Sequence, residues 1–251
     1  RSPIGRAGKG SLTGVRADDM TAQMVEAAMG KVPGLDPERV DDLLLGCGMP
    51  GGEQGMNMAR NVAVMLGWDT VPGATITRYC SSSLQTTRMA FHAIKAGEGD
   101  VFVSAGTESV SRMGRGSSDH IPGEDLTNPV FLEARARSDD RSGAGTAVWE
   151  DPRARGELPD VYIAMGQTAE NVAGLCGVTR EEQDAYAARS QQRAERAIAD
   201  GFWERDITPL TLADGTVVTA DDGPRPGTTV EVLATLEPVF RPDGTVTAGN
   251  A

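Results

Sequence analysis

The sequence predicts an α/β fold in which helices and short buried strands alternate along the chain. Over the first 112 residues, short apolar runs alternate with segments whose apolar residues recur every three or four positions. Hydrophobic residues make up 39% of the 251 residues and charged residues 24%, as in globular proteins that bury a core. No apolar run reaches about 18 residues, so no transmembrane helix is expected.

The first elements alternate between helix and strand. A helix is predicted for 18–29, where methionines and alanines form one apolar stripe, and a short strand follows over 40–47. A second helix is predicted for 55–67, because its apolar residues are four and three positions apart and its last glycine suits a C-terminal cap. The segment 71–80 is rich in β-branched residues, which predicts the next strand.

The spacing of the apolar residues changes at Ser81, where a helix of about four turns is predicted to begin. Its apolar stripe consists of Leu84, Thr87, Phe91 and Ile94. Asp100 to Gly106 is another short apolar run, typical of a buried strand. These alternating elements predict a layered α/β unit.

The composition changes after Met113. The next residues are polar and rich in Gly and Pro, and 135–150 look irregular. Regular structure is expected again over 161–177, and a helix follows over 179–201 that starts at a Thr179–Glu182 capping box. A hairpin with Asp214-Gly215 at its turn follows. Residues 113 to about 230 are therefore predicted to form a subdomain inserted in the α/β unit.

Charge and cysteine usage exclude several classes of function. The formal net charge is −12, which disfavours nucleic-acid and anionic membrane surfaces. An anionic small ligand remains compatible, because local arginines and helix N-termini can bind it. The three cysteines form no Cys-x-x-Cys pair and only two histidines are present, so no metal site is expected. The sparse cysteines and the absence of a signal-peptide-like segment predict a cytoplasmic protein.

Cys80 lies where a predicted strand meets a predicted helix, in TITRYCSSSLQ. A helix N-terminus carries unpaired N–H groups and a partial positive charge, which stabilise a thiolate. Ligands of α/β sheets bind beyond the carboxyl ends of strands, so this position suits a nucleophile. Free cysteines are also often buried core residues, and position alone leaves that alternative open. Cys47, inside a strand, and Cys176, at a helix end, are weaker candidates.

Four segments of the sequence carry a resemblance to a known family. They are RSPIGRAGKGSL, RYCSSSLQTTRMAFHAIKAGEGDVFVSAGTESVSRM, MGQTAENVAGLCGVTREEQDAYAARSQ and DDGPRPGTTVEVLATLEPVFRPDGTVTAGNA. In that order they resemble the N-terminal segment, the nucleophile segment, the lid, and the return from lid to core of the thiolases. This family includes acetyl-CoA acetyltransferases and 3-ketoacyl-CoA thiolases. Because the segments come in family order across nearly the whole chain, the resemblance is specific.

The resemblance implies a fold and a reaction. A thiolase consists of two similar halves of helix-covered mixed sheet, with a lid inserted in the first half. In this chain the core of the first half would be 1–112, the lid 113–230 and the return to the core 231–251. Thiolases cleave 3-ketoacyl-CoA with coenzyme A, or condense acetyl-CoA in reverse, through an acyl-cysteine that Cys80 matches. Coenzyme A would be a co-substrate, with no tightly bound cofactor and no metal, and the complete protein would be a homodimer or homotetramer.

The resemblance also indicates two substrate-binding residues. Met165 matches the lid methionine that lines the acyl-pantetheine pocket, and a core methionine is the alternative. In many thiolases a histidine precedes that methionine, whereas this chain has Ala164. Arg225 lies where the family approaches the nucleotide end of coenzyme A, and an arginine suits a phosphate there. A solvated loop arginine is the alternative.

Three alternative functions remain. A decarboxylating ketoacyl synthase of the same superfamily would use two downstream histidines. A thiolase would instead use a histidine and a second cysteine, both in the C-terminal half, so we expect this segment alone to be inactive. A non-catalytic thiolase-like protein would bind acyl-CoA or lipid without turnover, although the retention of Cys80 argues against it. An unrelated Cys–His hydrolase lacks a partner, because His92 is predicted to be mid-helix and His120 lies in a polar loop.

Overall fold

The computed structural model describes residues 1–113, 127–143 and 148–251. Contacts divide the chain into two compact units. Unit 1 comprises the described residues of Arg1–Pro122 and Trp203–Gly223, and unit 2 those of Gly123–Phe202 and Pro224–Ala251. His120 falls outside the described residues.

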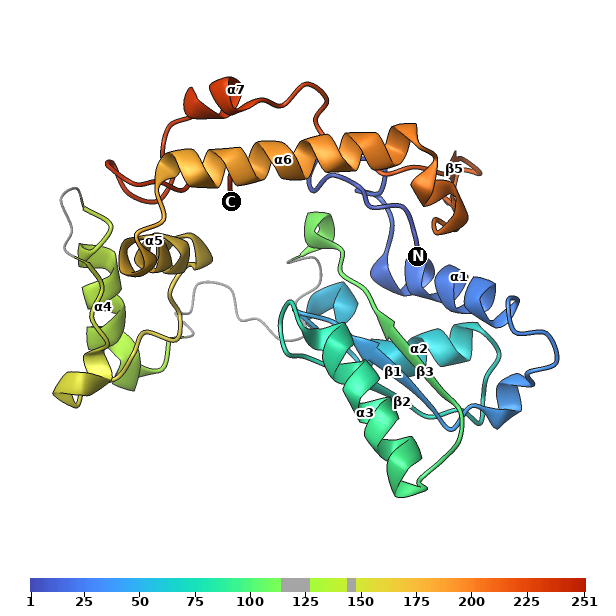
Figure 1. The fold of residues 1–251 in the computed structure, drawn as a ribbon. Helices are drawn as coiled ribbons and strands as arrows, with labels where there is room; N and C mark the ends of the chain where they lie inside the picture. The colour runs from blue at the N-terminus through green and yellow to red at the C-terminus, as the bar shows by residue number, and fades with distance from the viewer. Residues whose placement is uncertain (114–126, 144–147) are drawn as a thin grey trace. The chain divides into compact units, whose positions relative to one another are not determined.

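Unit 1 combines a parallel sheet with helices, and unit 2 is mainly helical (Figure 1). The elements of unit 1 are α1 (Ala17–Met29), β1 (Asp42–Gly46), α2 (Met58–Met65), β2 (Gly73–Ile76), α3 (Ser82–Ala96), β3 (Phe102–Gly106), β4 (Leu210–Thr211) and β5 (Val217–Val218). The helices of unit 2 are α4 (Leu132–Asp140), α5 (Met165–Cys176), α6 (Arg180–Ala199) and α7 (Val230–Ala234). The predicted α/β fold and its alternating order are confirmed.

Helix α4 corrects one expectation, because it occupies part of the stretch that looked irregular. Its sequence, LEARARSDD, is dominated by charged residues and buries only Ala134. A helix without an apolar stripe gives no periodic signal, so hydrophobic spacing did not reveal it.

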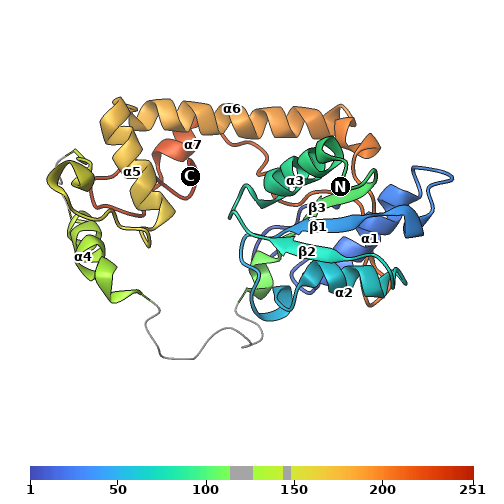
Figure 2. The same cartoon turned by 90° about the horizontal axis from the view of Figure 1, so that it is seen from below.

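The central sheet of unit 1 is parallel, with strand order β2-β1-β3. Leu43 of the middle strand pairs with Gly73 on one side and with Val103 on the other. Figure 2 shows α2 and α3 on opposite faces of this sheet. Leu43 and Leu45 point into the core cluster formed with α1 and α2, and Leu44, between them, is buried as well. Burial on both faces is typical of a central parallel strand.

Helix α3 faces the sheet with its small residues rather than with its apolar stripe. Leu84, Phe91 and Ile94 are 71%, 56% and 47% exposed. Its buried residues are instead Ser82, Thr86 and Ala90. The helix was predicted correctly, but the stripe that was expected to mark its buried face lies outward.

Two strand glycines explain this orientation. A Cβ atom on Gly46 would lie 2.5 Å from the backbone nitrogen of Ser83, and one on Gly106 would lie 2.5 Å from the Cβ of Ser83. The helix therefore touches the backbone of the sheet, and bulky side chains do not fit in between. Thr86, fully buried, bonds the hydroxyl of Ser104 at 3.0 Å.

The expected hairpin is present, and it packs in unit 1. β4 and β5 pair antiparallel, with Leu210 opposite Val218. Gln23 of α1 donates to the carbonyl of Thr211 at 2.9 Å, and Arg1 forms an ion pair with Asp221 at 2.9 Å. Units 1 and 2 therefore differ from the three segments predicted from the sequence, because residues 203–223 belong to unit 1. The inserted lid over 113–230 stays a prediction.

Unit 2 is held together by buried polar groups around α6. The predicted capping box is present: the Thr179 hydroxyl accepts from the N–H of Glu182, and the Glu182 carboxylate accepts from the N–H of Thr179. Asp184, only 1% exposed, accepts from Arg180 and from the side-chain amide of Asn250, each at 2.8 Å.

The Arg180–Asp184 pair also reaches α7. Arg180 donates to the carbonyls of Leu233 and Leu236, both at 2.8 Å. One ion pair thus joins α6, α7 and the turn that contains Asn250.

Candidate active site

Cys80 lies in the tight turn that joins β2 to α3. The residue before it, Tyr79, has φ +48°, a left-handed conformation that costs a bulky residue about 1–3 kcal/mol. The hydroxyl of Ser82 accepts from the N–H of Arg78 at 2.8 Å and donates to the carbonyl of Tyr79 at 2.6 Å. Ser82, the first residue of α3, therefore stabilises the turn that carries Cys80.

The thiol of Cys80 is free and exposed. It precedes α3 by two positions and follows the carboxyl end of β2, as the sequence predicted. A buried, space-filling role for Cys80 is therefore wrong. An exposed thiol beside a helix N-terminus has the access and the electrostatic surroundings that a nucleophile needs.

The other two cysteines, Cys47 and Cys176, differ from Cys80 in burial or in their position on a helix. Cys47 is buried, and desolvation together with the nearby Glu108 carboxylate raises the pKa of its thiol to about 11. Such a thiol is protonated at neutral pH and unreactive. Cys176 is exposed, but it is the last residue of α5 and therefore does not lie at a helix N-terminus.

Glu108 holds the loop that follows β1. Its carboxylate accepts from the N–H of Gly48 at 2.6 Å and from the side-chain amide of Gln54 at 2.8 Å. The thiol of Cys47 donates to the same carboxylate at 3.7 Å. The sequence analysis did not single out Glu108, although an acidic residue two positions after a predicted strand was a signal that it lies at the ligand-binding edge of the sheet.

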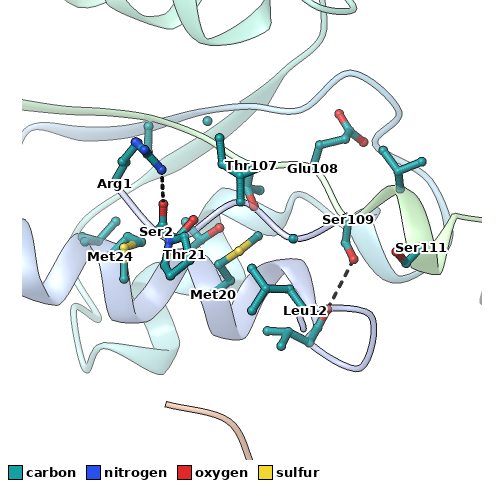
Figure 3. A pocket seen from close by; sticks show the side chains of 18 of the residues that line it. Arg1, Ser2, Leu12, Met20, Thr21, Met24, Thr107, Glu108, Ser109 and Ser111 are labelled. Atoms are coloured by element: carbon teal, nitrogen blue, oxygen red, sulfur yellow. Dashed lines mark hydrogen bonds between the residues drawn. The ribbon is translucent and has the colours of Figure 1, made fainter. Parts of the chain in front are cut away.

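A cavity of about 580 Å³ lies beside β3 (Figure 3). Its walls come from the N-terminal residues 1–7, from α1 and from the strand together with the residues that follow it. Met20 and Met24 of α1 give one wall its apolar character. Cys80, Met165 and Arg225 do not line this cavity, so it is separate from the predicted site.

Thr107 is one of the residues that line this cavity, and its buried hydroxyl has no hydrogen-bond partner among the described residues. An unpaired buried hydroxyl costs free energy, and valine has the same shape without it. We expect Thr107→Val to raise the free energy of unfolding by about 1 kcal/mol, measured by urea denaturation. A loss of stability would show that the hydroxyl has a partner.

Met165 and Arg225 belong to unit 2, whereas Cys80 belongs to unit 1. Met165 is the first residue of α5 and 77% exposed, so it is not a core methionine. Arg225 is exposed in a loop that rests on α6, where its N–H donates to Gln191 at 3.1 Å. The N–H of Gly227, in the same loop, donates to Glu195 at 3.0 Å.

The residues that the structure describes form neither a metal-binding cluster nor a membrane-spanning helix. Within 1–113, 127–143 and 148–251, no group of three or more His, Cys, Asp and Glu side chains is arranged to hold a metal ion. No helix in those ranges is both long and apolar enough to cross a bilayer.

Comparison with known families decides where the chain belongs. The family described as "Thiolase, N-terminal domain" matches residues 1–251. The chain belongs to the thiolase family. Its α/β fold is that of the thiolase N-terminal domain. It superimposes on the crystal structure of the Bacillus anthracis acetyl-CoA acetyltransferase with a TM-score of 0.77 and 35% identity, covering 100% of this chain and 59% of that one.

Curated thiolases are similar over the whole of this chain. It is 38% identical over 264 residues to the 3-ketoacyl-CoA thiolase of Bacillus subtilis (strain 168). It is 40% identical over 268 residues to the beta-ketoadipyl-CoA thiolase of Pseudomonas aeruginosa. In both comparisons all of this chain is covered, and it spans 60% of the relative's length.

Proposed function

We propose that the protein to which this chain belongs is an acyltransferase that works through an acyl-cysteine on Cys80. The thiolate attacks the 3-keto carbon of a 3-ketoacyl-CoA, and the bond between C2 and C3 breaks. Acetyl-CoA leaves after its C2 takes a proton. The thiol of coenzyme A then attacks the thioester, which releases the shortened acyl-CoA and restores the cysteine. The reverse sequence condenses two acetyl-CoA molecules.

The exposed turn of Cys80 is the observation that carries this proposal. A thioester intermediate needs a nucleophile that a bulky substrate can reach, and Cys80 meets that requirement while Cys47 does not. Family membership supports the same chemistry, since the relatives are named as thiolases of ketoacyl-CoA compounds.

Two residues of unit 2 are proposed to bind the co-substrate, coenzyme A. The exposed Met165 offers an apolar, flexible contact for the acyl-pantetheine arm. The exposed Arg225 offers a guanidinium for a phosphate of the nucleotide. The complete protein is proposed to assemble as a homodimer or homotetramer, and no tightly bound cofactor is needed for the reaction.

The test is to trap the acyl-enzyme in the complete protein that contains this chain. After incubation with acetoacetyl-CoA and an acid quench, peptide mass spectrometry is expected to find an acetyl group on Cys80. The Cys80→Ser variant is expected to carry none. An acetyl group on Cys176 instead, or a folded protein that carries none, would contradict the proposal.

A further inference from the structure

Hydrogen bonds connect Glu108 to the turn of Cys80, although the two residues follow different strands. The carboxylate of Glu108 accepts from the N–H of Gly48 at 2.6 Å. The carbonyl of Gly48 accepts from the hydroxyl of Thr77 at 2.9 Å, and Thr77 leads directly into the turn. The connection therefore runs from the end of β3, across the end of β1, to the end of β2.

Close packing reinforces the same connection. A Cβ atom on Gly48 would lie 2.8 Å from a carboxylate oxygen of Glu108 and 3.5 Å from the carbonyl carbon of Tyr79. Gly48 thus has no room for a side chain on the Glu108 side, and its backbone lies next to Tyr79. Tyr79 is left-handed, a conformation that a bulky residue keeps only where its surroundings hold it. The backbone of Gly48 is part of those surroundings.

Glu108 is itself firmly placed. Gln54, which is buried, donates to its carboxylate at 2.8 Å and accepts from the N–H of Ser109 at 2.6 Å. Gln54 also donates to the carbonyl of Met49 at 2.9 Å. The carboxylate therefore cannot move without breaking its bonds to Gly48 and Gln54, which both lie in the loop after β1.

We propose that Glu108 is a positioning residue for Cys80. Through Gly48 and Thr77 it keeps the turn in the shape that presents the thiolate to the N-terminal N–H groups of α3. This inference rests on the proposed role of Cys80 as the acyl acceptor. Glu108 takes no part in bond making and acts only through the turn.

The test is the alkylation rate of Cys80 by iodoacetamide in the 251-residue chain, followed between about pH 6 and 9 by peptide mass spectrometry. Cys176 is the internal reference, because it is exposed in the same molecule. Glu108→Gln is expected to lower the Cys80-to-Cys176 rate ratio about three- to fivefold at neutral pH. A glutamine has one acceptor oxygen where the carboxylate has two, so it cannot accept from both Gly48 and Gln54, and the turn loses part of its support. The midpoint of the pH profile is expected to rise.

The direction of the change separates positioning from simple electrostatics. Removal of a nearby negative charge by itself favours the thiolate, so it would raise the ratio and lower the midpoint. Thr77→Val breaks the same connection at an exposed residue and is expected to lower the ratio as well. The double variant is expected to be no worse than Glu108→Gln, because both changes interrupt one path. Thr107→Val, the neighbouring control, is expected to leave the ratio unchanged.

The outcomes of the experiment separate a failure of the nucleophile role of Cys80 from a failure of the positioning role of Glu108. If Cys80 in the unchanged chain is no faster than Cys176, its role as the nucleophile fails and the positioning role fails with it. If Cys80 is fast and the Glu108→Gln ratio is unchanged or higher, only the positioning role fails. Loss of the native circular-dichroism signal would show that Glu108→Gln has unfolded the unit, and the Thr77→Val ratio then decides.

Discussion

Asp184→Ala is expected to lower the free energy of unfolding by about 3 kcal/mol or more. Asp184 is 1% exposed and forms an ion pair with Arg180 at 2.8 Å. Its removal leaves the largely buried guanidinium without its carboxylate and frees the amide of Asn250. Urea denaturation followed by circular dichroism measures the loss.

A matched control lies on the same helix. Arg193 is exposed on α6, and Arg193→Ala is expected to change stability by no more than about 0.5 kcal/mol. Asp184→Asn keeps the shape but not the charge, so it is expected to fall between the two. A loss below about 1 kcal/mol for Asp184→Ala would show that the ion pair is not important for stability.

Gly46→Ala is expected to cost about 1–3 kcal/mol, because the added methyl group has no room. A Cβ atom at this position would lie 2.5 Å from the backbone nitrogen and 2.6 Å from a backbone carbon of the first turn of α3, at Ser83 and Ser82. Backbone atoms cannot swing aside as a side chain does, so the helix must move away from the sheet. The midpoint of thermal unfolding is expected to fall accordingly.

Gly14→Ala serves as the control for Gly46→Ala. It lies in the same unit, and nothing lies within 4 Å of its added Cβ atom. We expect it to leave the thermal midpoint nearly unchanged. Equal midpoints for the two variants would mean that α3 adjusts to the methyl group without cost.

The elements that the sequence predicted best are those with a periodic pattern or a strong cap. Helix α1 was predicted over 18–29 and spans Ala17–Met29, although its buried residues are Ala17, Asp18, Thr21 and Val25 rather than the predicted stripe. Helix α6 begins at the predicted capping box. The hairpin turns where Asp214-Gly215 indicated, with Gly215 at φ +85°. These signals are local, so a single stretch of sequence contains them.

Features that depend on contacts between distant residues were not predictable in the same way. The connection from Glu108 to Thr77 joins residues that follow different strands, and only the strand order brings them together. Position in the sequence put Cys80 where a strand meets a helix but left its exposure open, and its left-handed neighbour Tyr79 followed from no local signal. The catalytic role of Cys80 and the binding roles of Met165 and Arg225 remain predictions.

The orientation of α3 has a consequence for protein redesign. Patterning rules turn a helix so that its apolar residues face the sheet. Applied here, they would press Leu84 and Phe91 against the glycines of β1 and β3, where even a methyl group does not fit. A redesigned sequence should keep serine, threonine and alanine on the inner side of this helix, since residue size rather than hydropathy decides which side touches the strands.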